Sequence, residues 1–169
     1  ISALVNPAKL IPPAIEFVDI AGLVAGASKG EGLGNRFLAH IREVDAIIHV
    51  VRAFNDDDIT HVSGRVDPIS DAGTIETELA LADLETLERA IERTSKAAKT
   101  GDKKVLRELE ILKTTHEALS NDMQIAALLT EDEVIHALKP LCLLTAKPVV
   151  YVANVAESEL EGNEKVEAL

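Results

Sequence analysis

Three short runs of apolar and β-branched residues constrain the fold of this 169-residue chain more than any other feature. They cover residues 15–21, 46–51 and 148–154, and Gly, Pro, Asp or Asn residues bound each of them. Runs of this length and composition predict β-strands. Their nearly continuous apolar character is typical of strands that are covered on both faces, as in a parallel sheet. We therefore expect an α/β fold.

A glycine-rich loop and an amphipathic segment separate the first two runs. Residues 33–44 have apolar side chains three or four positions apart, which predicts a helix and, with the flanking strands, a βαβ unit. The glycines of the loop do not fit a dinucleotide-binding fingerprint, because the third comes too early. So many glycines let the loop change shape at small cost, as a phosphate-responsive switch must. They are Gly26, Gly30, Gly32 and Gly34.

From Gly73 the apolar residues recur at helical spacing, which predicts a helical insertion over residues 73–129. The pattern stops at residues 99–102, where Gly101 is placed to end one helix and Asp102 to cap the next. Two long helices joined by so short a turn form an antiparallel hairpin. Charge pairs one turn apart support the first helix, Glu85 with Arg89 and Glu92 with Lys96.

The segment before the last apolar run carries two local signals. Residues 130–133 have the pattern of a capping box, which predicts a further short helix. Cys142 is the only cysteine of the chain, which excludes an internal disulfide framework. Its apolar neighbours predict a thiol that is buried in the core.

The two ends and the hydropathy of the chain bear on its location. No leader sequence and no apolar run of membrane-spanning length occurs, so we expect a cytoplasmic protein. The chain opens inside an apolar stretch and without methionine. We therefore expect it to be an internal fragment of a longer protein.

Charge is distributed unevenly along the chain. The net charge is −12, which argues against indiscriminate nucleic-acid binding, and aromatic residues make up only 2%, too few for base-stacking platforms. Residues 89–107, at the predicted hairpin tip, nevertheless carry seven basic and two acidic side chains. A solvated helix surface is the alternative, but this imbalance favours contact with RNA phosphates. The residues expected to make it are Lys96, Lys99, Lys103, Lys104 and Arg107.

Asp19 closes the first apolar run and is the first candidate for nucleotide chemistry. A carboxylate at a strand end can hold a Mg²⁺-bound water near the phosphates of a nucleotide. Gly22, three residues later, would let its backbone N–H approach a γ-phosphate. A plain turn after a strand is the alternative for these two residues.

Asn154, Val155 and Glu157 end or follow the last apolar run, and ligands of doubly wound sheets bind beyond the carboxyl ends of the strands. An Asn side chain can pair with the N6/N7 edge of adenine. Guanine readers place an Asp where this chain has Glu157, whose side chain is one methylene longer. A polar loop without a ligand is the alternative here.

Sequence runs spread over the whole chain resemble the YchF group of Obg-like ATPases. The resemblance covers essentially all 169 residues in order, and several runs are too long for coincidence. The runs that carry it are residues 17–24, 26–35, 55–64, 77–85 and 151–155.

This resemblance implies a Ras-like P-loop NTPase domain over residues 1–72 and 130–169, with the hairpin of residues 73–129 inserted. Whole proteins of the group continue into a small β-rich TGS domain. The implied activity is ATP hydrolysis, with Mg²⁺ as cofactor and K⁺ as a further candidate ion. ATP is preferred over GTP because Asn-x-x-Glu replaces Asn-Lys-x-Asp, a pattern that Asn154 to Glu157 match. The implied partners are the large ribosomal subunit and ribosomal RNA, without a membrane or a specific DNA sequence.

The resemblance also assigns roles to single residues. Asp19 and Gly22 match switch II, the segment that responds to the γ-phosphate. Leu23 stands where Ras-like enzymes have a water-orienting Gln, and a Leu side chain cannot hydrogen-bond water. His61 matches a histidine of the group that is proposed for this catalytic task. A loop histidine bonded to a neighbouring carboxylate is the alternative for His61.

The sequence departs from the group in one respect, because it contains no G-x-x-x-x-G-K-[ST] motif. Without that phosphate cradle, we expect this piece alone to bind ATP poorly and to hydrolyse it negligibly. Two other functions stay open. One is a nucleotide-gated ribosome-binding or RNA-binding module with negligible hydrolysis, and the other is an Obg-type GTPase, against which Glu157 argues.

Overall fold

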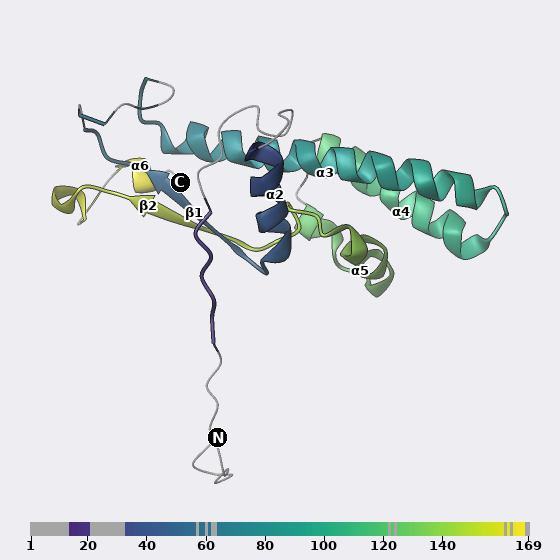
Figure 1. Ribbon diagram of the computed structural model, residues 1–169. Helices are drawn as coiled ribbons and strands as arrows, with labels where there is room; N and C mark the ends of the chain where they lie inside the picture. The colour runs from purple at the N-terminus through teal and green to yellow at the C-terminus, as the bar shows by residue number, and fades with distance from the viewer. Residues whose placement is uncertain are drawn as a thin grey trace, which may run out of the picture.

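The computed structural model places two strands and a long helical hairpin at opposite ends of an elongated molecule (Figure 1). It describes residues 14–20, 33–56, 58, 59, 61, 64–121, 123, 125–160, 162 and 164–167. The main elements are α2 (Leu33–Glu43), β1 (Ile47–Arg52), α3 (Pro68–Ala98), α4 (Lys103–Ser120), α5 (Asp132–Leu138) and β2 (Val149–Asn154). Short turns of helix complete the described part, namely η2 (Ile125–Leu128), η3 (Lys139–Leu141), η4 (Glu157–Glu159) and α6 (Glu164–Glu167).

The two strands lie side by side and run parallel, as the sequence predicted. Their register pairs Ile47 with Val149 at one end and Arg52 with Asn154 at the other. The backbone N–H of Ala53 extends the pairing, because it donates to the carbonyl of Asn154 at 2.7 Å. Both strands therefore end at the same edge of the sheet, where the candidate base-reading residues follow β2.

The prediction that these strands are covered on both faces is wrong for the described part of the chain. Ile48 and Val50 are 50% and 61% exposed, and their register partners Val150 and Val152 are 56% and 42% exposed. Successive strand residues point to opposite faces, so these four side chains share one open apolar face. Helix α3 contacts β1, and Ile47 packs against a cluster from α2 and α3.

The predicted strand over residues 15–21 is also wrong for its described residues. Residues 14–20 form no strand, and Ile15 and Phe17 are 80% and 75% exposed. Figure 1 shows this segment, in purple, extending away from β1 and β2 toward the N-terminus rather than lying along them. A strand needs a neighbour for its backbone hydrogen bonds, and the apolar pattern predicts burial without naming that neighbour. Only Ile20 packs against the core cluster of α2 and α3.

Helix α3 begins earlier than Gly73, the predicted start of the helical insertion. The side chain of Asp67 caps it by accepting a hydrogen bond from the backbone N–H of Ser70 at 3.2 Å. Pro68 follows in the first turn, where a missing N–H costs nothing. The predicted boundary at residue 73 thus falls inside one continuous helix.

This helix takes part in both regions of the molecule. Its first half packs against α2, with Leu79 and Ala82 next to Leu38 and Ile41. Its second half packs against α4, and the resulting hairpin projects away from the sheet (Figure 1). A single rigid element therefore connects the sheet region to the tip of the hairpin.

The turn of the hairpin matches the sequence prediction. Helix α3 ends at Ala98, and Gly101 takes a left-handed backbone conformation with φ of 79°. Asp102 caps α4, because its side chain accepts from the backbone N–H of Lys104 at 2.8 Å. Both predicted charge pairs on α3 are present, Glu92 with Lys96 at 2.7 Å and Glu85 with Arg89 at 4.0 Å.

The hairpin and α5 enclose the larger apolar core. Leu87, Leu112 and Ile125 are 0%, 1% and 0% exposed, and Leu138 of α5 joins the same cluster. The predicted short helix is confirmed as α5, but the predicted capping box is wrong. The cap residue is Glu131, whose side chain makes no capping hydrogen bond.

Cys142 is exposed, so the prediction of a buried thiol is wrong. It ends the short helix η3 in the left-handed conformation, with φ of 48°. The chain turns at this residue, and the next two side chains, Leu143 and Leu144, take the buried positions instead. An apolar run predicts burial of the segment, but the turn decides which of its side chains face inward.

Hydrogen bonds to Asp83 of α3 hold the segment that precedes β2. The fully buried Asp83 carboxylate accepts from the backbone N–H groups of Leu144 and Thr145 at 2.9 and 2.8 Å, and from the Thr145 hydroxyl at 2.8 Å. Burial raises the pKa of Asp83, while these hydrogen bonds and the nearby Arg42 act in the opposite direction.

Across the described ranges, none of the helices combines the length and apolar character needed to cross a membrane.

Candidate functional site

The carboxyl ends of the parallel strands hold the predicted base-reading residues. Asn154 is the last residue of β2 and Glu157 the first of η4, and both are exposed. The turn between them is fixed locally. The carbonyl of Ala156 accepts from the backbone N–H of Glu159 at 2.9 Å, and the Ala156 N–H donates to the Glu159 carboxylate at 3.3 Å. The loop therefore presents one amide and one carboxylate side chain to solvent.

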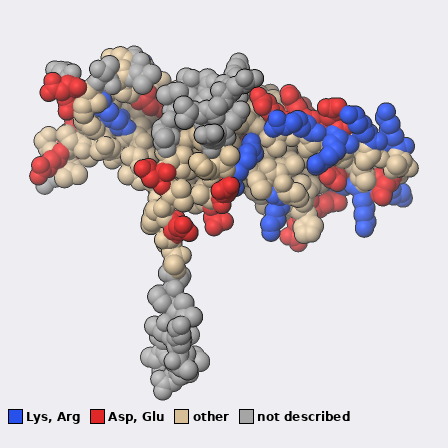
Figure 2. Space-filling model, in the orientation of Figure 1, with Lys and Arg blue, Asp and Glu red and all other residues tan. Residues whose placement is uncertain are grey.

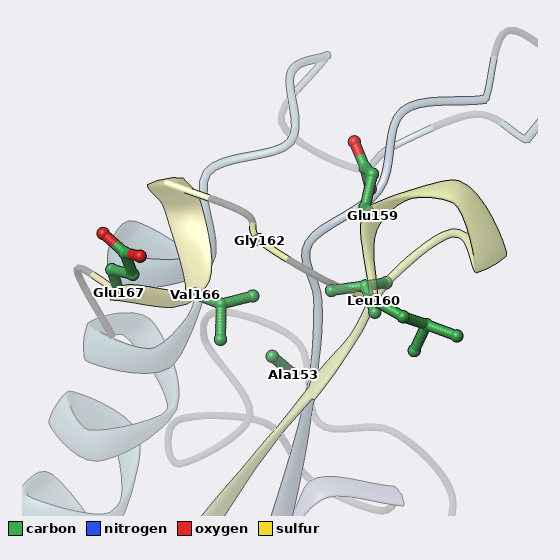
Figure 3. Close-up of a pocket in the computed structure, with 7 residues that line it drawn as sticks. Ala153, Glu159, Leu160, Gly162, Val166 and Glu167 are labelled. Carbon is green, nitrogen blue, oxygen red and sulfur yellow. The ribbon is translucent and has the colours of Figure 1, made fainter.

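A cavity of about 230 Å³ lies next to this loop (Figure 3). In Figure 3, Leu160 and Val166 point toward each other across it, and Glu167 lies at its margin. Of the predicted nucleotide-binding residues that the structure describes, Val155 lines it, whereas Asn154 and Glu157 do not. The described residues that line it are Ala153, Val155, Glu159, Leu160, Gly162, Val166 and Glu167.

The structure does not join Asp19 to this loop. Asp19 is exposed on the irregular segment 14–20, and among described residues no hydrogen bond or ion pair links it to Asn154, Glu157 or His61. Gly22, the other predicted switch II residue, lies outside the described residues. The described part of the chain also holds no cluster of three His, Cys, Asp or Glu side chains that would bind a metal ion.

His61 lies against the beginning of α3. Its Nε2 is 3.0 Å from Oδ2 of Asp71, a residue in the first turn of that helix, and the His61 side chain is 17% exposed. The contact matches the alternative that the sequence left open, a loop histidine bonded to a nearby carboxylate.

Arg52, which was not among the predicted site residues, organises the loop that leads to His61. Its Nε donates to the carbonyl of Phe54 at 3.0 Å, and its Nη1 and Nη2 donate to Ile59 and Asp56 at 3.0 and 3.2 Å. The guanidinium also lies 4.6 Å from the centre of the Phe54 ring. The sequence signal that could have identified Arg52 is a basic residue at the end of an otherwise apolar strand.

A polar contact between the sheet and α3 was also missed. The rings of His49 and Tyr151, which are register partners, lie 5.6 Å apart, and the Tyr151 hydroxyl is hydrogen-bonded to Glu76 of α3. Burial and the Glu76 carboxylate raise the pKa of Tyr151 to about 12. Burial lowers the pKa of His49, and the charge of Glu76 acts against that shift. These residues are far apart in sequence, so no local sequence pattern could predict their contact.

The basic side chains of the hairpin fall into two groups. Lys96 is paired with Glu92 at 2.7 Å, and Arg107 lies between Glu110 and Glu133 at 2.9 and 3.0 Å. The other predicted contact residues are exposed and form no ion pair with any described residue, namely Lys99, Lys103 and Lys104. Figure 2 shows the Lys and Arg side chains gathered toward the free end of the hairpin.

Comparison with known proteins gives consistent matches. The 50S ribosome-binding GTPase family matches residues 5–83. "Ribosome-binding ATPase YchF" of Bacillus subtilis is 56% identical over 98% of this chain and 46% of the relative. The protein of that name from Escherichia coli O157:H7 is 52% identical over 96% of this chain and 45% of its own length. The solved Schizosaccharomyces pombe YchF GTPase superposes with a TM-score of 0.71 at 32% identity, over 99% of this chain and 41% of that one.

These matches agree on the fold but use two names for the activity. The bacterial relatives are named ATPases, whereas the family description and the yeast structure are named GTPases. The chain spans slightly less than half the length of the relatives it matches. The predicted P-loop NTPase fold is confirmed by the structural match and by the parallel strands with flanking helices. Sequence identity above one half along nearly its full length, with the matching structure, places this chain in the YchF family.

Proposed function

We propose that the full-length protein is a cytoplasmic, ribosome-binding ATPase in which switch II couples the nucleotide state to ribosome affinity. The observation that carries the proposal is the loop directly after β2. Asn154 and Glu157 lie there, at the edge where both parallel strands end, and both are exposed. Ligands of open α/β sheets bind at this edge. Relatives that share the fold are named ribosome-binding ATPases.

The two exposed side chains are suited to adenine. The Asn154 amide offers a donor and an acceptor, which match the N7 acceptor and N6 amine of adenine. Glu157 offers only acceptor oxygens at neutral pH, and its extra methylene displaces them from the place where an Asp would meet guanine. Val155, which lines the neighbouring cavity, would contact the face of the base.

Two matched substitutions test this base preference in the full-length protein. Glu157→Asp should raise the affinity for GTP relative to ATP by about tenfold, since one well-placed hydrogen bond to a base is worth ~1–3 kcal/mol. Glu117→Asp, at an exposed site on α4, is the control and should leave the ratio unchanged. The measurement is competition of unlabelled ATP and GTP against a fluorescent ATP analogue. An unchanged ratio in Glu157→Asp, or an equal shift in both variants, would overturn the role of Glu157.

Phosphate binding is proposed for Asp19 and Gly22. Asp19 is the only one of the two within the described residues, and its exposed carboxylate is a suitable single ligand for Mg²⁺. This ion usually keeps several waters and takes one or two carboxylates together with substrate phosphates. When bound, Mg²⁺ would neutralise phosphate charge, and K⁺ remains a further proposed ion. Asp19→Ala should therefore weaken the dependence of ATP affinity on Mg²⁺ in an equilibrium titration.

His61 is proposed to orient the attacking water. A Ras-like enzyme uses Gln for this task, whereas this chain has Leu23 at the matching position, outside the described residues. A neutral imidazole can accept a hydrogen bond from water. His61→Ala in the full-length protein tests the role, with a fall in kcat as the expected result, because an alanine side chain cannot hydrogen-bond water.

Ribosome contact is proposed for the tip of the inserted hairpin, which we assign to residues 73–129. Lys99, Lys103 and Lys104 form no ion pair within the described chain, so they lose no protein partner when they meet RNA phosphates. Lys96 and Arg107 already neutralise acidic neighbours. The large-subunit RNA is therefore expected to contact the three unpaired lysines first.

A pair of double variants with equal charge change tests this surface. Lys103 and Lys104 lie in the first turn of α4, where Glu is favoured by the helix dipole, so changing both to Glu should preserve the fold. Changing Lys113 and Lys139 to Glu alters the net charge equally at exposed sites away from the tip. Binding to purified large subunits is measured at several salt concentrations.

The tip variant should bind more weakly, and its slope of log affinity against log salt should fall by about 1.5, since each phosphate contact contributes roughly 0.7 to 0.9. The Lys113 and Lys139 variant should keep the original slope. Equal effects of both variants would mean that overall charge, and not the hairpin tip, governs association.

One observation favours a second function, a ribosome-binding module that hydrolyses ATP slowly. His61 is bonded to Asp71, and no contact with Asp19 is present among the described residues. In such a module the nucleotide acts as a conformational ligand, and hydrolysis serves as a timer. Ribosomes should then leave the hydrolysis rate of the full-length protein unchanged, whereas the ATPase proposed above should be stimulated by them.

A further inference from the structure

The segment that leads into β2, residues 142–147, is hydrogen-bonded to both α2 and α3. Lys147 reaches the end of α2, where its Nζ donates to the carbonyl of Arg42 at 3.2 Å and to that of Val44. The last carbonyls of a helix have no partner inside the helix and carry partial negative charge, so an ammonium group satisfies them well. Asp83 of α3 accepts from two backbone N–H groups of the same segment. Both helices therefore hold this segment.

Arg42, in the last turn of α2, also connects that helix directly to α3. Its Nη2 donates to Oγ1 of Thr86 at 3.2 Å, and its Nη1 donates to the carbonyl of Cys142 at 3.5 Å. The Thr86 hydroxyl donates to the carbonyl of Ala82 in its own helix at 2.9 Å, which leaves its oxygen as an acceptor for the guanidinium. Arg42 thus contacts both of the other elements.

Apolar packing joins the same three elements. Leu144 is 0% exposed and lies in one cluster with Ile41 of α2 and Ala82 of α3. A close-packed interior deforms little, and a hydrogen bond weakens steeply once its geometry is lost. A displacement of α2 must therefore either move α3 with it or break the contacts of Arg42.

These contacts lie between the parts of the molecule that the proposed function must connect. Helix α2 begins at Leu33, directly after the glycine-rich loop and the candidate switch II residues in the sequence. Helix α3 continues without a break to Ala98 and carries the hairpin that projects from the sheet (Figure 1). Strand β2 begins two residues after Lys147 and ends at Asn154. A movement that starts at the nucleotide can thus reach the hairpin through α2.

We propose that the contact between Arg42 and Thr86 transmits nucleotide-dependent movement of α2 to α3 and so sets the position of the hairpin tip. Lys147 and Asp83 keep the segment before β2 attached to both helices. This inference rests on the proposed function, because it names the contact through which switch II acts on ribosome affinity. It requires no contact of Arg42 or Thr86 with nucleotide or RNA.

Hydrogen exchange of the full-length protein without ribosomes tests this transmission. Exchange is compared between the ADP complex and the complex with a non-hydrolysable ATP analogue, and peptides of both α2 and α3 should differ between the two. Thr86→Val removes the acceptor and keeps the shape of the side chain. The difference should then persist in α2 and fall about threefold in α3, within the range by which residues that carry coupling modulate it.

Thr77→Val is the matched control for this variant. Thr77 is exposed on the same helix, and its hydroxyl donates to the carbonyl of Gly73 at 2.7 Å, just as that of Thr86 donates to Ala82. The response of α3 should be unchanged in this control.

A double-mutant cycle assigns the effect to the pair, because Arg89 also donates to Thr86, at 3.4 Å. Arg42→Lys keeps the positive charge but replaces the planar fork of donors with one ammonium group. It should reduce the α3 response as Thr86→Val does, and the double variant should lose no more than either single variant. Additive losses would mean that the two residues act separately and would overturn the proposal.

Ribosome binding tests the consequence for function. The ratio of affinities for large subunits with the ATP analogue and with ADP should fall about fivefold in Thr86→Val and stay unchanged in Thr77→Val. An α3 response that is absent from the original protein, or equal in the original and in Thr86→Val, would contradict the proposal. If the α3 response depends on Thr86 while ribosome affinity is the same with both nucleotides, the transmission stands, and the coupling to the ribosome in the proposed function is the part that fails.

Discussion

The α3–α4 hairpin and the β1–β2 pair are both built from apolar sequence, yet they bury it to different extents. In the hairpin, Leu87 and Leu112 are almost fully buried between the two helices and α5. In the sheet, Ile48 and Val150 are half exposed on a face that no described element covers. The hairpin therefore supplies its own core, whereas described helices pack against one face of the sheet and leave the other open.

This difference follows from how each element buries its apolar side chains. An amphipathic helix has one apolar stripe, and a second helix joined by a short turn is enough to cover it. A strand in a parallel sheet presents apolar side chains on both faces and needs a layer of helices on each. In the described chain, α2 and α3 contribute the core cluster on one side only. Local pattern thus decides burial in the hairpin, and neighbouring layers decide it in the sheet.

The largest effect is expected from a cavity in the hairpin core. Leu112→Ala should lower the local stability of α3 and α4 by about 3 kcal/mol, the usual cost of removing a buried leucine side chain. Ile48→Ala, on the open face, should cost less than about 0.5 kcal/mol. Hydrogen exchange of peptides from each region measures both in the full-length protein. A loss at Ile48 as large as that at Leu112 would break the comparison, because this face would then be covered in the whole protein.

A smaller effect is expected where the two regions are joined. Asp83→Asn should destabilise the loop before β2 by about 2 kcal/mol, because an amide cannot accept all three hydrogen bonds that the carboxylate accepts. Exchange of the Leu144 and Thr145 amides should rise. Asp132→Asn, at an exposed site, is the control and should have no such effect. Unchanged exchange at Leu144 would mean that apolar packing alone holds this joint.

The smallest effect concerns His49 on the packed side of the sheet. Because burial lowers its pKa in the folded protein, the unfolded chain binds the proton first as the pH falls. The stability that neutral His49 contributes is thus present above the unfolded value of 6.5 and is lost as the pH falls below it. Unfolding measured at pH 7.5 and 5.5 should show a smaller difference for His49→Gln than for the original protein. An equal difference would mean that His49 does not contribute, with Glu76 offsetting its burial.

Helix positions could largely be predicted because their signals are local. The turn at Gly101 and the cap at Asp102 were predicted correctly, since both residues act on their immediate neighbours. The start of α3 was not predicted, although Asp67 and Pro68 are residue types typical of a helix N-terminus. The capping box before α5 was predicted and is absent, which shows that a pattern of residue types does not fix the rotamers a cap needs.

The candidate site could be predicted only in its parts. The position of Asn154 and Glu157 after a strand could be read from the sequence, because parallel strands end at one edge. The contacts between His61 and Asp71 and between Arg52 and the loop carbonyls could not, since they depend on how the loop folds back. The proposed approach of Asp19 to the base-reading loop stays a prediction, because the structure shows no contact between them among the described residues.

The sequence alone predicted the two parallel strands, the main helices and the hairpin, because periodicity and turn glycines act over a few positions. It also determined which residue types stand after β2 and at the hairpin tip. Only the tertiary structure decided which faces are covered, that Cys142 points outward, and that Asp83 and Asp71 each meet a distant or folded-back partner. Burial and polar pairing depend on neighbours in space, and a short stretch of sequence does not specify what packs against it.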